Sequence, residues 1–274
     1  MIARFGKWHS ALAGTLTATA LAVSAAACSA QEYKSGRIWP EPKVVEPGKE
    51  GNPPADAVVL FDGKDMSAFT GADAWEVKDG AVTIHRAGRS GGQDFCETKQ
   101  AFGDCQLHLE FATPEKVSGN GQGRGNSGVF FMQHYELQIL DSYNNPTYFD
   151  GQCGAIYKQM PPQVNVSRKP GEWQTYDAVF HAPHFDDNGK VTKPASITAF
   201  QNGVMILDNF ELEGGTFYYQ PAEYTAHPPR LPLRLQDHGN PVKFRNIWIR
   251  ELHPMSFTMP EKKPSEGAKA AKGG

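Results

Sequence analysis

Short strand-like segments separated by tight turns constrain the fold of this chain more than any other feature. Between about residues 55 and 254, helical periodicity is almost absent, and apolar and polar residues alternate instead. In the segment 106–111 (QLHLEF), for example, Leu107 and Leu109 face one way, whereas the polar residues face the other. Asp-Gly and Asn-Gly pairs between such segments are typical of hairpin turns. The pattern predicts an antiparallel, all-β fold.

The number of predicted strands narrows the architecture further. About a dozen strand segments within roughly 200 residues are typical of two antiparallel sheets that pack face to face. The large size, and strands that are polar on one side, favour a jelly-roll sandwich with one concave sheet. Such a sheet has a core face and a groove face, and the groove could hold a polar ligand.

Both ends of the chain are predicted to lie outside the folded domain. Arg4 and Lys7 precede an apolar stretch at 11–23 and small residues that end at Cys28, which is the pattern of a bacterial export signal. We expect residues 1–28 to be a signal peptide and favour lipidation at Cys28 over simple cleavage and release. The protein would then be periplasmic or lipid-anchored to a bacterial membrane. The remaining expected segments are a Pro/Gly-rich tether (29–55), the β-sandwich (56–254) and a disordered tail (255–274).

Charge and cysteine content exclude several classes of protein. A formal net charge of −3 over 274 residues argues against nucleic acid as the partner, because phosphate binding needs a basic surface. No apolar run beyond the N-terminus is long enough to span a membrane. Export makes a disulfide between Cys96 and Cys105 chemically possible, if they lie on neighbouring strands, and Cys153 would then have no partner. No cysteine or histidine spacing indicates a zinc site.

The segment 124–141 (RGNSGVFFMQHYELQILD) carries the strongest functional pattern. It is predicted to form a hairpin whose second strand has Glu136 and Gln138 on one side and apolar residues on the other. A strand face with an acid and an amide suits a polar ligand such as a sugar, although an ordinary solvated face would look similar. Other predicted strands also carry polar residues opposite their core residues. The candidate site residues are Glu110, Asn126, Glu136, Gln138, Asp141, Gln236, His238 and Arg245.

Ordinary glycoside hydrolysis would require a second carboxylate beside Glu136. In a retaining enzyme the two carboxyl groups lie about 5–5.5 Å apart. Asp141 would share the face of Glu136 only if a β-bulge intervened, and Gln138 stands where jelly-roll glucanases carry an Asp. These departures weaken the interpretation as a conventional glucanase. A non-catalytic, lectin-like sugar-binding module remains a further alternative.

Most of the folded part resembles the 3-keto-disaccharide hydrolase family. The resemblance runs from about residue 58 to residue 252 and includes, in order, LFDGKDMSAF, WEVKDGAV, RGNSGVFF, YELQILDSYNNPTYFDGQCGAIY and LPLRLQDHGNPVKFRNIWIREL. It implies a sandwich of the concanavalin A-like lectin/glucanase type. It also implies cleavage of glycosides whose sugar carries a ketone at C3.

That chemistry needs proton transfer rather than direct displacement. A ketone at C3 acidifies the hydrogen on C2, so a base can remove it, the C1 substituent can leave, and water can then add. We expect Glu136 or His238 to be the base and the other to be the acid, because a histidine pKa of about 6.5 suits either role. A divalent metal held by these two residues and an amide oxygen is left open. The residues expected to contact the sugar are Asn126, Gln138, Gln236 and Arg245, with Glu110 and Asp141 as further candidates.

Overall fold

The computed structural model describes residues 32–49, 51–73, 75–84 and 94–260. The described residues divide into two units, a smaller one that includes residues 32–39 and 257–260, and a larger one within residues 40–256. In the smaller unit, Ile38 forms an isolated antiparallel bridge with Thr258. The predicted signal peptide, including Cys28, lies outside the described residues. In the described part of the chain, no helix is long and apolar enough to cross a membrane.

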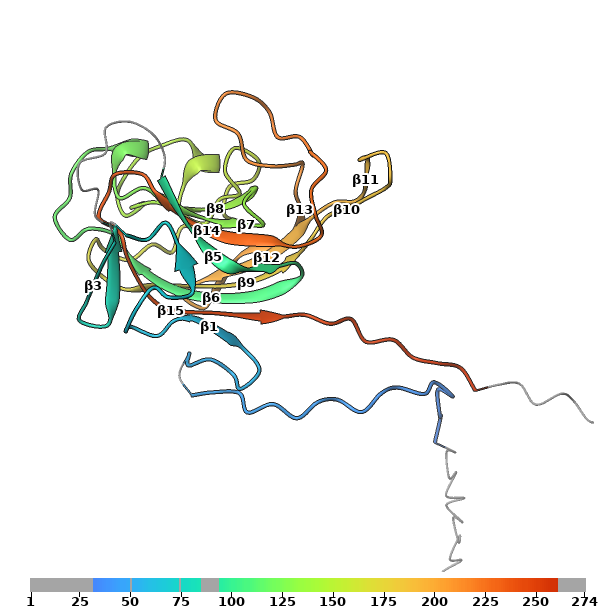
Figure 1. The fold of residues 1–274 in the computed structure, drawn as a ribbon. Coiled ribbons are helices and arrows are strands. Elements are labelled where there is room, and N and C mark those ends of the chain that lie inside the picture. Colours follow the sequence, from blue (N-terminus) through green and yellow to red (C-terminus); the bar gives the residue numbers. More distant parts are fainter. Residues whose placement is uncertain (1–31, 50, 74, 85–93, 261–274) are drawn as a thin grey trace, which may run out of the picture. The chain divides into compact units, whose positions relative to one another are not determined.

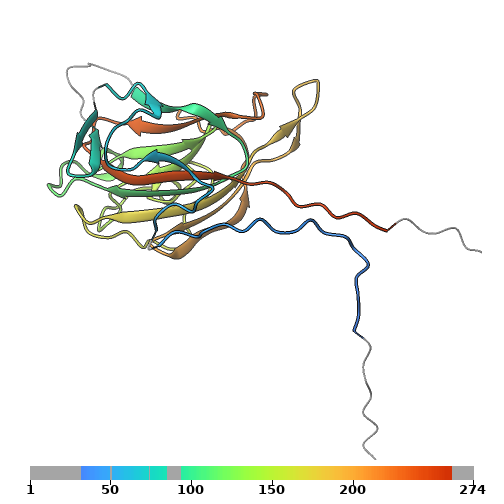
Figure 2. The same cartoon turned by 60° about the horizontal axis from the view of Figure 1, so that its bottom comes forward.

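The larger unit is an antiparallel β-sandwich, which confirms the predicted fold class. Figure 1 shows β5, β7, β8 and β14 in one layer and β6, β9, β12 and β15 in the other, and Figure 2 shows the same layers from another side. Each strand pairs with its neighbours in antiparallel fashion. One sheet has the order β13 (Val204–Glu211), β12 (Ser196–Gln201), β9 (Gln174–His181), β6 (Cys105–Ala112), β15 (Lys243–Glu251), β4 (Ala81–Ile84) and β3 (Trp75–Lys78), with β1 (Val58–Phe61) paired to β15. The second has the order β2 (Phe69–Thr70), β5 (Asp94–Phe102), β14 (Leu231–Asp237), β7 (Ser127–Phe131) and β8 (Tyr135–Ile139), and a small separate sheet pairs β10 (His184–Phe185) with β11 (Val191–Lys193).

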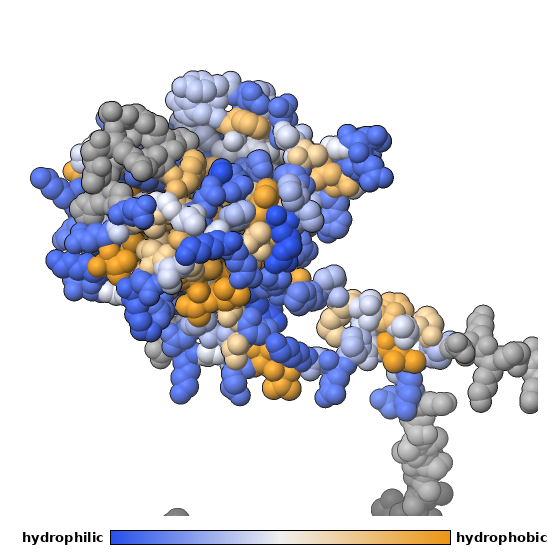
Figure 3. Space-filling view, in the orientation of Figure 1, coloured by the Kyte–Doolittle hydropathy of each residue, from blue (hydrophilic) through white to orange (hydrophobic). Residues whose placement is uncertain are grey.

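The core lies between the two large sheets and follows from strand alternation. Along β9, buried and partly exposed residues alternate without interruption, so Tyr176 and Phe180 point into the core. Phe131 from the opposite sheet stacks on Phe180, with ring centroids 4.7 Å apart. Hydrophilic side chains dominate the surface of the larger unit that Figure 3 shows, with apolar residues in small groups. This distribution is expected when the apolar faces of both sheets are turned toward each other.

Strand β8 is the last strand of the five-stranded sheet, yet all its residues are buried. A loop segment covers its free edge, because Gln138 donates its backbone N–H to Ala155 and accepts one from Gly154, both at 2.9 Å. The covered edge cannot pair with another chain.

The later part of the predicted tether, from Pro40 onward, belongs to the larger unit. Gly51 offers its carbonyl oxygen to the Asn246 side chain and to the Trp248 indole N–H, each at 3.0 Å. Asp56 pairs with Arg250 at 2.8 Å. These contacts hold the segment against strand β15.

Cys96 and Cys105 are free thiols, and the predicted disulfide between them is wrong. Cys96 lies on β5 in the five-stranded sheet, whereas Cys105 lies on β6 in the eight-stranded sheet. The turn between these strands carries the chain from one sheet to the other instead of forming a hairpin. Both thiols are buried in the core.

Candidate active site

A pocket of about 850 Å³ opens beside the five-stranded sheet, on the face turned away from the core. Its size is in the range of small-molecule binding sites. Of the eight predicted site residues, five line it. The complete lining is Phe95, Gln122, Gly123, Asn126, Phe130, Glu136, Gln138, Tyr157, Thr216, Tyr218, Tyr219, Gln236 and His238.

Glu136 on β8 is the only carboxylic acid among the described residues that line the pocket. Its side chain is buried, and no hydrogen-bond or ionic partner is found for its carboxyl group in the described part of the chain. Burial in this position raises the pKa of Glu136 to about 8, because the charged form loses its hydration. Gly128 on the neighbouring strand β7 leaves room for it, since a Cβ at that position would collide with the Glu136 carboxyl. The acid is therefore mostly protonated at neutral pH.

Two buried amide oxygens accompany this acid in the pocket. Gln138 lies two residues after Glu136, so both side chains project from the same face of β8. Its Nε2 donates to Gln122 Oε1 at 3.1 Å, whereas its own Oε1 has no partner. Gln236 on β14 likewise has an unpaired, buried Oε1. An unsatisfied buried acceptor costs about 1–3 kcal/mol, which a hydroxyl donor from a ligand would offset.

Asn126 and His238 stand at the ends of the strands that form the pocket. Asn126 precedes β7, is buried, and donates its Nδ2 to the Gln122 backbone oxygen at 2.7 Å. His238 follows β14 and is exposed, so it lies where the pocket meets solvent. The structure thus places one buried acid and one exposed imidazole in the same pocket.

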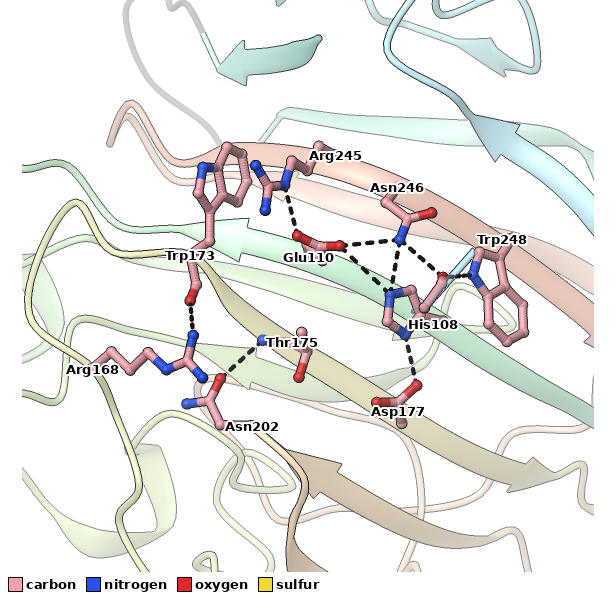
Figure 4. Close-up of polar contacts among 11 residues, drawn as sticks. His108, Glu110, Arg168, Trp173, Thr175, Asp177, Asn202, Arg245, Asn246 and Trp248 are labelled. Carbon is pink, nitrogen blue, oxygen red and sulfur yellow. Dashed lines mark hydrogen bonds and ion pairs between the residues drawn. The ribbon is translucent and has the colours of Figure 1, made fainter. Parts of the chain in front are cut away.

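Glu110 and Arg245 lie elsewhere, on the outer face of the eight-stranded sheet. Arg245 Nε pairs with Glu110 at 2.6 Å, and its guanidinium lies 4.1 Å from the centre of the Trp173 ring. Figure 4 shows these residues together with Asn246, which donates to Glu110 at 3.0 Å. His108 in the same cluster bonds Asp177 at 2.6 Å. The prediction that Glu110 and Arg245 join the pocket is wrong, because alternation identifies the polar side of a strand but not the sheet to which the strand belongs.

Asp141 is also absent from the pocket lining. It is buried and forms an ion pair with Arg124 at 2.6 Å. Its second oxygen accepts the Tyr143 backbone N–H at 3.1 Å. Asp141 therefore stabilises the turn that follows β8, and the prediction that it contacts the sugar is wrong.

The pocket contains residues that the sequence pattern did not single out. Tyr157 hydrogen-bonds Tyr148 through their hydroxyl groups at 2.6 Å, and burial raises the Tyr157 pKa. Thr216 accepts the Glu136 backbone N–H at 3.1 Å. Both come from loops rather than strands. The adjacent tyrosines at 218 and 219 in a loop sequence were the available indication, because paired aromatics outside strands often lie at binding surfaces.

The metal left open by the sequence would have to use the donors of this pocket. Among the described residues, no group of three or more histidine, cysteine, aspartate or glutamate side chains could hold an ion. The pocket offers one carboxyl group, one imidazole and two unpaired amide oxygens. Such oxygen and imidazole donors are compatible with several divalent metals, and a metal at Glu136 and His238 stays a prediction.

Fold and pocket together define a concanavalin A-like β-sandwich with a polar, ligand-sized site on one sheet. Residues 56–250 match the family model described as the 3-keto-alpha-glucoside-1,2-lyase-like domain. The chain belongs to this family.

Individual relatives agree with this assignment. A 3-keto-disaccharide hydrolase from Bacteroides thetaiotaomicron is 22% identical over 237 residues, which cover 73% of this chain and 80% of the relative. The crystal structure of a candidate glycosyl hydrolase from Parabacteroides distasonis is 42% identical, with a TM-score of 0.73, over 81% of this chain and 95% of the other. A second such structure from that organism shares the fold, with 23% identity, a TM-score of 0.51, and coverage of 72% and 99%. These names support a carbohydrate hydrolase as the general class.

Proposed function

We propose that this protein cleaves glycosides whose sugar is oxidised to a ketone at C3. The observation that carries the proposal is a single buried acid, Glu136, with a pKa of about 8 and two unpaired amide oxygens in the same pocket. A two-carboxylate mechanism lacks its second acid, because Asp141 is paired with Arg124 and Glu136 is the only acid among the described lining residues. The names of the family and of its Bacteroides relative also support keto-sugar chemistry.

In this mechanism Glu136 takes the C2 proton. A carboxylate with a raised pKa is a stronger base than an ordinary one, which suits abstraction from carbon. The electron pair of the C2–H bond moves toward the C3 carbonyl, and the C1–O bond then breaks. The leaving oxygen receives a proton, for which His238 at the solvent side is the donor. Water adds across the C1–C2 double bond, so the net reaction is hydrolysis.

The amides of the pocket would orient the sugar. Gln138 Oε1 and Gln236 Oε1 are free to accept from sugar hydroxyls, and Asn126 lies beside them. Each satisfied acceptor would contribute about 1 kcal/mol to binding. A divalent cation in the pocket would supply further stabilisation of the enolate oxygen.

The decisive experiment compares oxidised and unoxidised sugars. Purified protein is incubated with 3-keto-trehalose and 3-keto-lactose, and separately with trehalose and lactose, each with and without chelator. We expect release of monosaccharide from the keto-sugars only. Cleavage of the unoxidised sugars alone would indicate a conventional glucanase, and binding without cleavage would indicate a lectin-like module. Loss of activity with chelator and recovery with added metal would establish the cation.

The pH profile separates the two assignments of Glu136. If Glu136 is the base, kcat/KM rises as the pH increases through about 8, because only the ionised form accepts a proton. If it is the acid, kcat/KM falls over the same interval. A profile without either change, measured on 3-keto-trehalose, would remove Glu136 from proton transfer.

We also propose that the protein is exported and lipid-anchored through Cys28, on the basis of the N-terminal pattern. A Cys28→Ser variant expressed in a bacterial host should move from the membrane fraction to the soluble fraction. Its N-terminal peptide should lack the mass of a lipid in mass spectrometry. A wild-type protein that stays soluble would contradict the anchor.

A further inference from the structure

A second cavity of about 610 Å³ adjoins the candidate active site. The two share three lining residues, Tyr157, Tyr218 and Tyr219, so they lie side by side. A ligand that extends from the first cavity toward the second would contact these three tyrosines. The second cavity is lined by Tyr148, Asp150, Tyr157, Lys158, Gln159, Gly215, Phe217, Tyr218, Tyr219, Gln220, Pro221 and Ala222.

Five of the twelve residues that line this cavity are aromatic, and several of their rings are unusually exposed. Tyr219 is 94% exposed, Tyr218 is 57% exposed and Tyr148 is 41% exposed. The Tyr218 and Tyr219 rings are perpendicular, with centroids 4.6 Å apart. Covering large, water-exposed aromatic side chains with a partner is favourable, because it removes apolar surface from water. Their position at the groove therefore indicates a surface that binds a ring.

The loop that carries Tyr218 and Tyr219 is held at its base. Gly215 pairs with Glu223 in an isolated bridge, and Thr216 donates its N–H to the His134 carbonyl at 2.8 Å. Lys158 donates its Nζ to the Tyr218 backbone oxygen at 2.8 Å and lies 4.4 Å from the centre of the Tyr218 ring. These contacts fix the tip of the loop before any ligand binds, which lowers the entropy cost of binding.

The two cavities differ in chemistry. The acid, the imidazole and the unpaired amide oxygens line only the first cavity, whereas Tyr148 and Phe217 line only the second, and three tyrosines line both. In a glycoside, the group on C1 is the part that extends away from the reacting ring. It would meet the aromatic surface when the sugar occupies the first cavity.

We propose that the second cavity is the leaving-group subsite, and that its tyrosines select a leaving group whose ring has an apolar face over a small alkyl group. This inference rests on the proposed function. The shared chemistry is a ring with an apolar face, which a second pyranose or an aromatic alcohol would supply. The ring of the oxidised sugar stays in the first cavity. The tyrosines therefore affect which glycosides are accepted rather than the chemistry at C2.

The test uses three 3-keto-glucosides that differ only in the leaving group: methyl, glucosyl (3-keto-trehalose) and 4-nitrophenyl. The readout is the ratio of kcat/KM for each ring-bearing substrate to that for the methyl glycoside. We expect Tyr219→Ala and Tyr148→Ala to lower this ratio roughly tenfold, the size of one lost aromatic contact. Tyr219→Phe, which keeps the ring, should preserve it. Tyr33→Ala is the matched control, because Tyr33 is 88% exposed and lines neither cavity.

The outcomes distinguish this inference from the function on which it rests. If wild type cleaves no keto-glucoside, both fall. If wild type cleaves them and the ratios are the same in all variants, the leaving-group subsite is overturned while the proposed function stands. A lower ratio for 3-keto-trehalose alone supports a sugar as the leaving group, and a lower ratio for the 4-nitrophenyl substrate alone supports an aromatic alcohol.

Discussion

Glu136 illustrates how burial can create a reactive group without any charged neighbour. Its carboxyl group loses hydration in the pocket and gains no ion pair, so the protonated form is favoured up to about pH 8. A sequence pattern can place such an acid on a polar strand face, as alternation did for Glu136 and Gln138. It cannot show that the face is enclosed, because the loops that cover β8 come from distant parts of the chain.

Replacing Glu136 with Gln tests its role in the chemistry. The substitution keeps size and hydrogen bonding but removes proton transfer, so we expect kcat on 3-keto-trehalose to fall about 10²- to 10⁴-fold. Binding of the keto-sugar, measured by calorimetry, should persist. Glu172→Gln, which changes an exposed acid outside both cavities, is the control. A Glu136→Gln variant with wild-type kcat would exclude the acid from catalysis.

The same residue should make stability depend on pH. Between its ordinary value of 4.5 and about 8, Glu136 keeps its proton in the folded state and loses it in the unfolded state. The free energy of unfolding therefore falls as the pH rises through this window, by at most about 1.4 kcal/mol per pH unit from this group. Above the window both states are ionised and the contribution stops changing.

Urea unfolding of wild type and Glu136→Gln at several pH values between about 5 and 8 isolates this effect. The variant lacks the titrating group, so the stability of wild type relative to the variant should decrease with pH. A relative stability that stays constant over this range would mean that the pKa of Glu136 is not raised in the folded protein.

At the scale of elements, the sequence predicted strands and their faces better than the sheets that the strands join. The hairpin of β7 and β8, the strand at Gln236 and the all-β class all follow from alternation and turn chemistry. Glu110 and Arg245 show the limit, because β6 and β15 pair with each other in the other sheet. Cys96 and Cys105 show the same limit, since no local pattern says that a turn crosses from one sheet to the other.

The cluster at Glu110 should therefore contribute to stability rather than to activity. Glu110 accepts hydrogen bonds from Arg245 and Asn246, and its side chain is mostly buried. We expect Glu110→Ala to lower the free energy of unfolding by about 1–3 kcal/mol, because two donors lose a charged acceptor. Arg245 is partly exposed, so water would compensate part of the loss.

Chemical denaturation together with steady-state kinetics checks this prediction. The kcat/KM of Glu110→Ala on 3-keto-trehalose should equal that of wild type at a temperature where both are folded. Gln236→Ala, on the pocket face, should show the opposite pattern of raised KM with little change in stability. A large loss of kcat/KM in Glu110→Ala would show that this residue contributes to activity after all.

At the scale of the whole molecule, the folded unit begins earlier than the family match. The match covers residues 56–250, whereas the larger unit begins at Pro40. Composition alone predicted a tether up to residue 55, because Pro, Gly and charged residues rarely form strands. The segment is held by the backbone carbonyl oxygen of Gly51 and by the side chain of Asp56. A backbone contact such as that of Gly51 cannot be predicted from a pattern of side chains.

Truncation locates the boundary. A chain begun at residue 40 keeps Gly51 and Asp56, so its free energy of unfolding should match that of a chain begun at residue 29. A chain begun at residue 57 leaves the Asn246 amide and the Trp248 indole without the Gly51 oxygen and leaves Arg250 without Asp56. We expect that chain to be less stable by about 1–3 kcal/mol, the size of a few lost hydrogen bonds at a partly exposed site. Urea denaturation of the three chains measures the difference. Equal stability of all three would mean that the folded unit begins near residue 56.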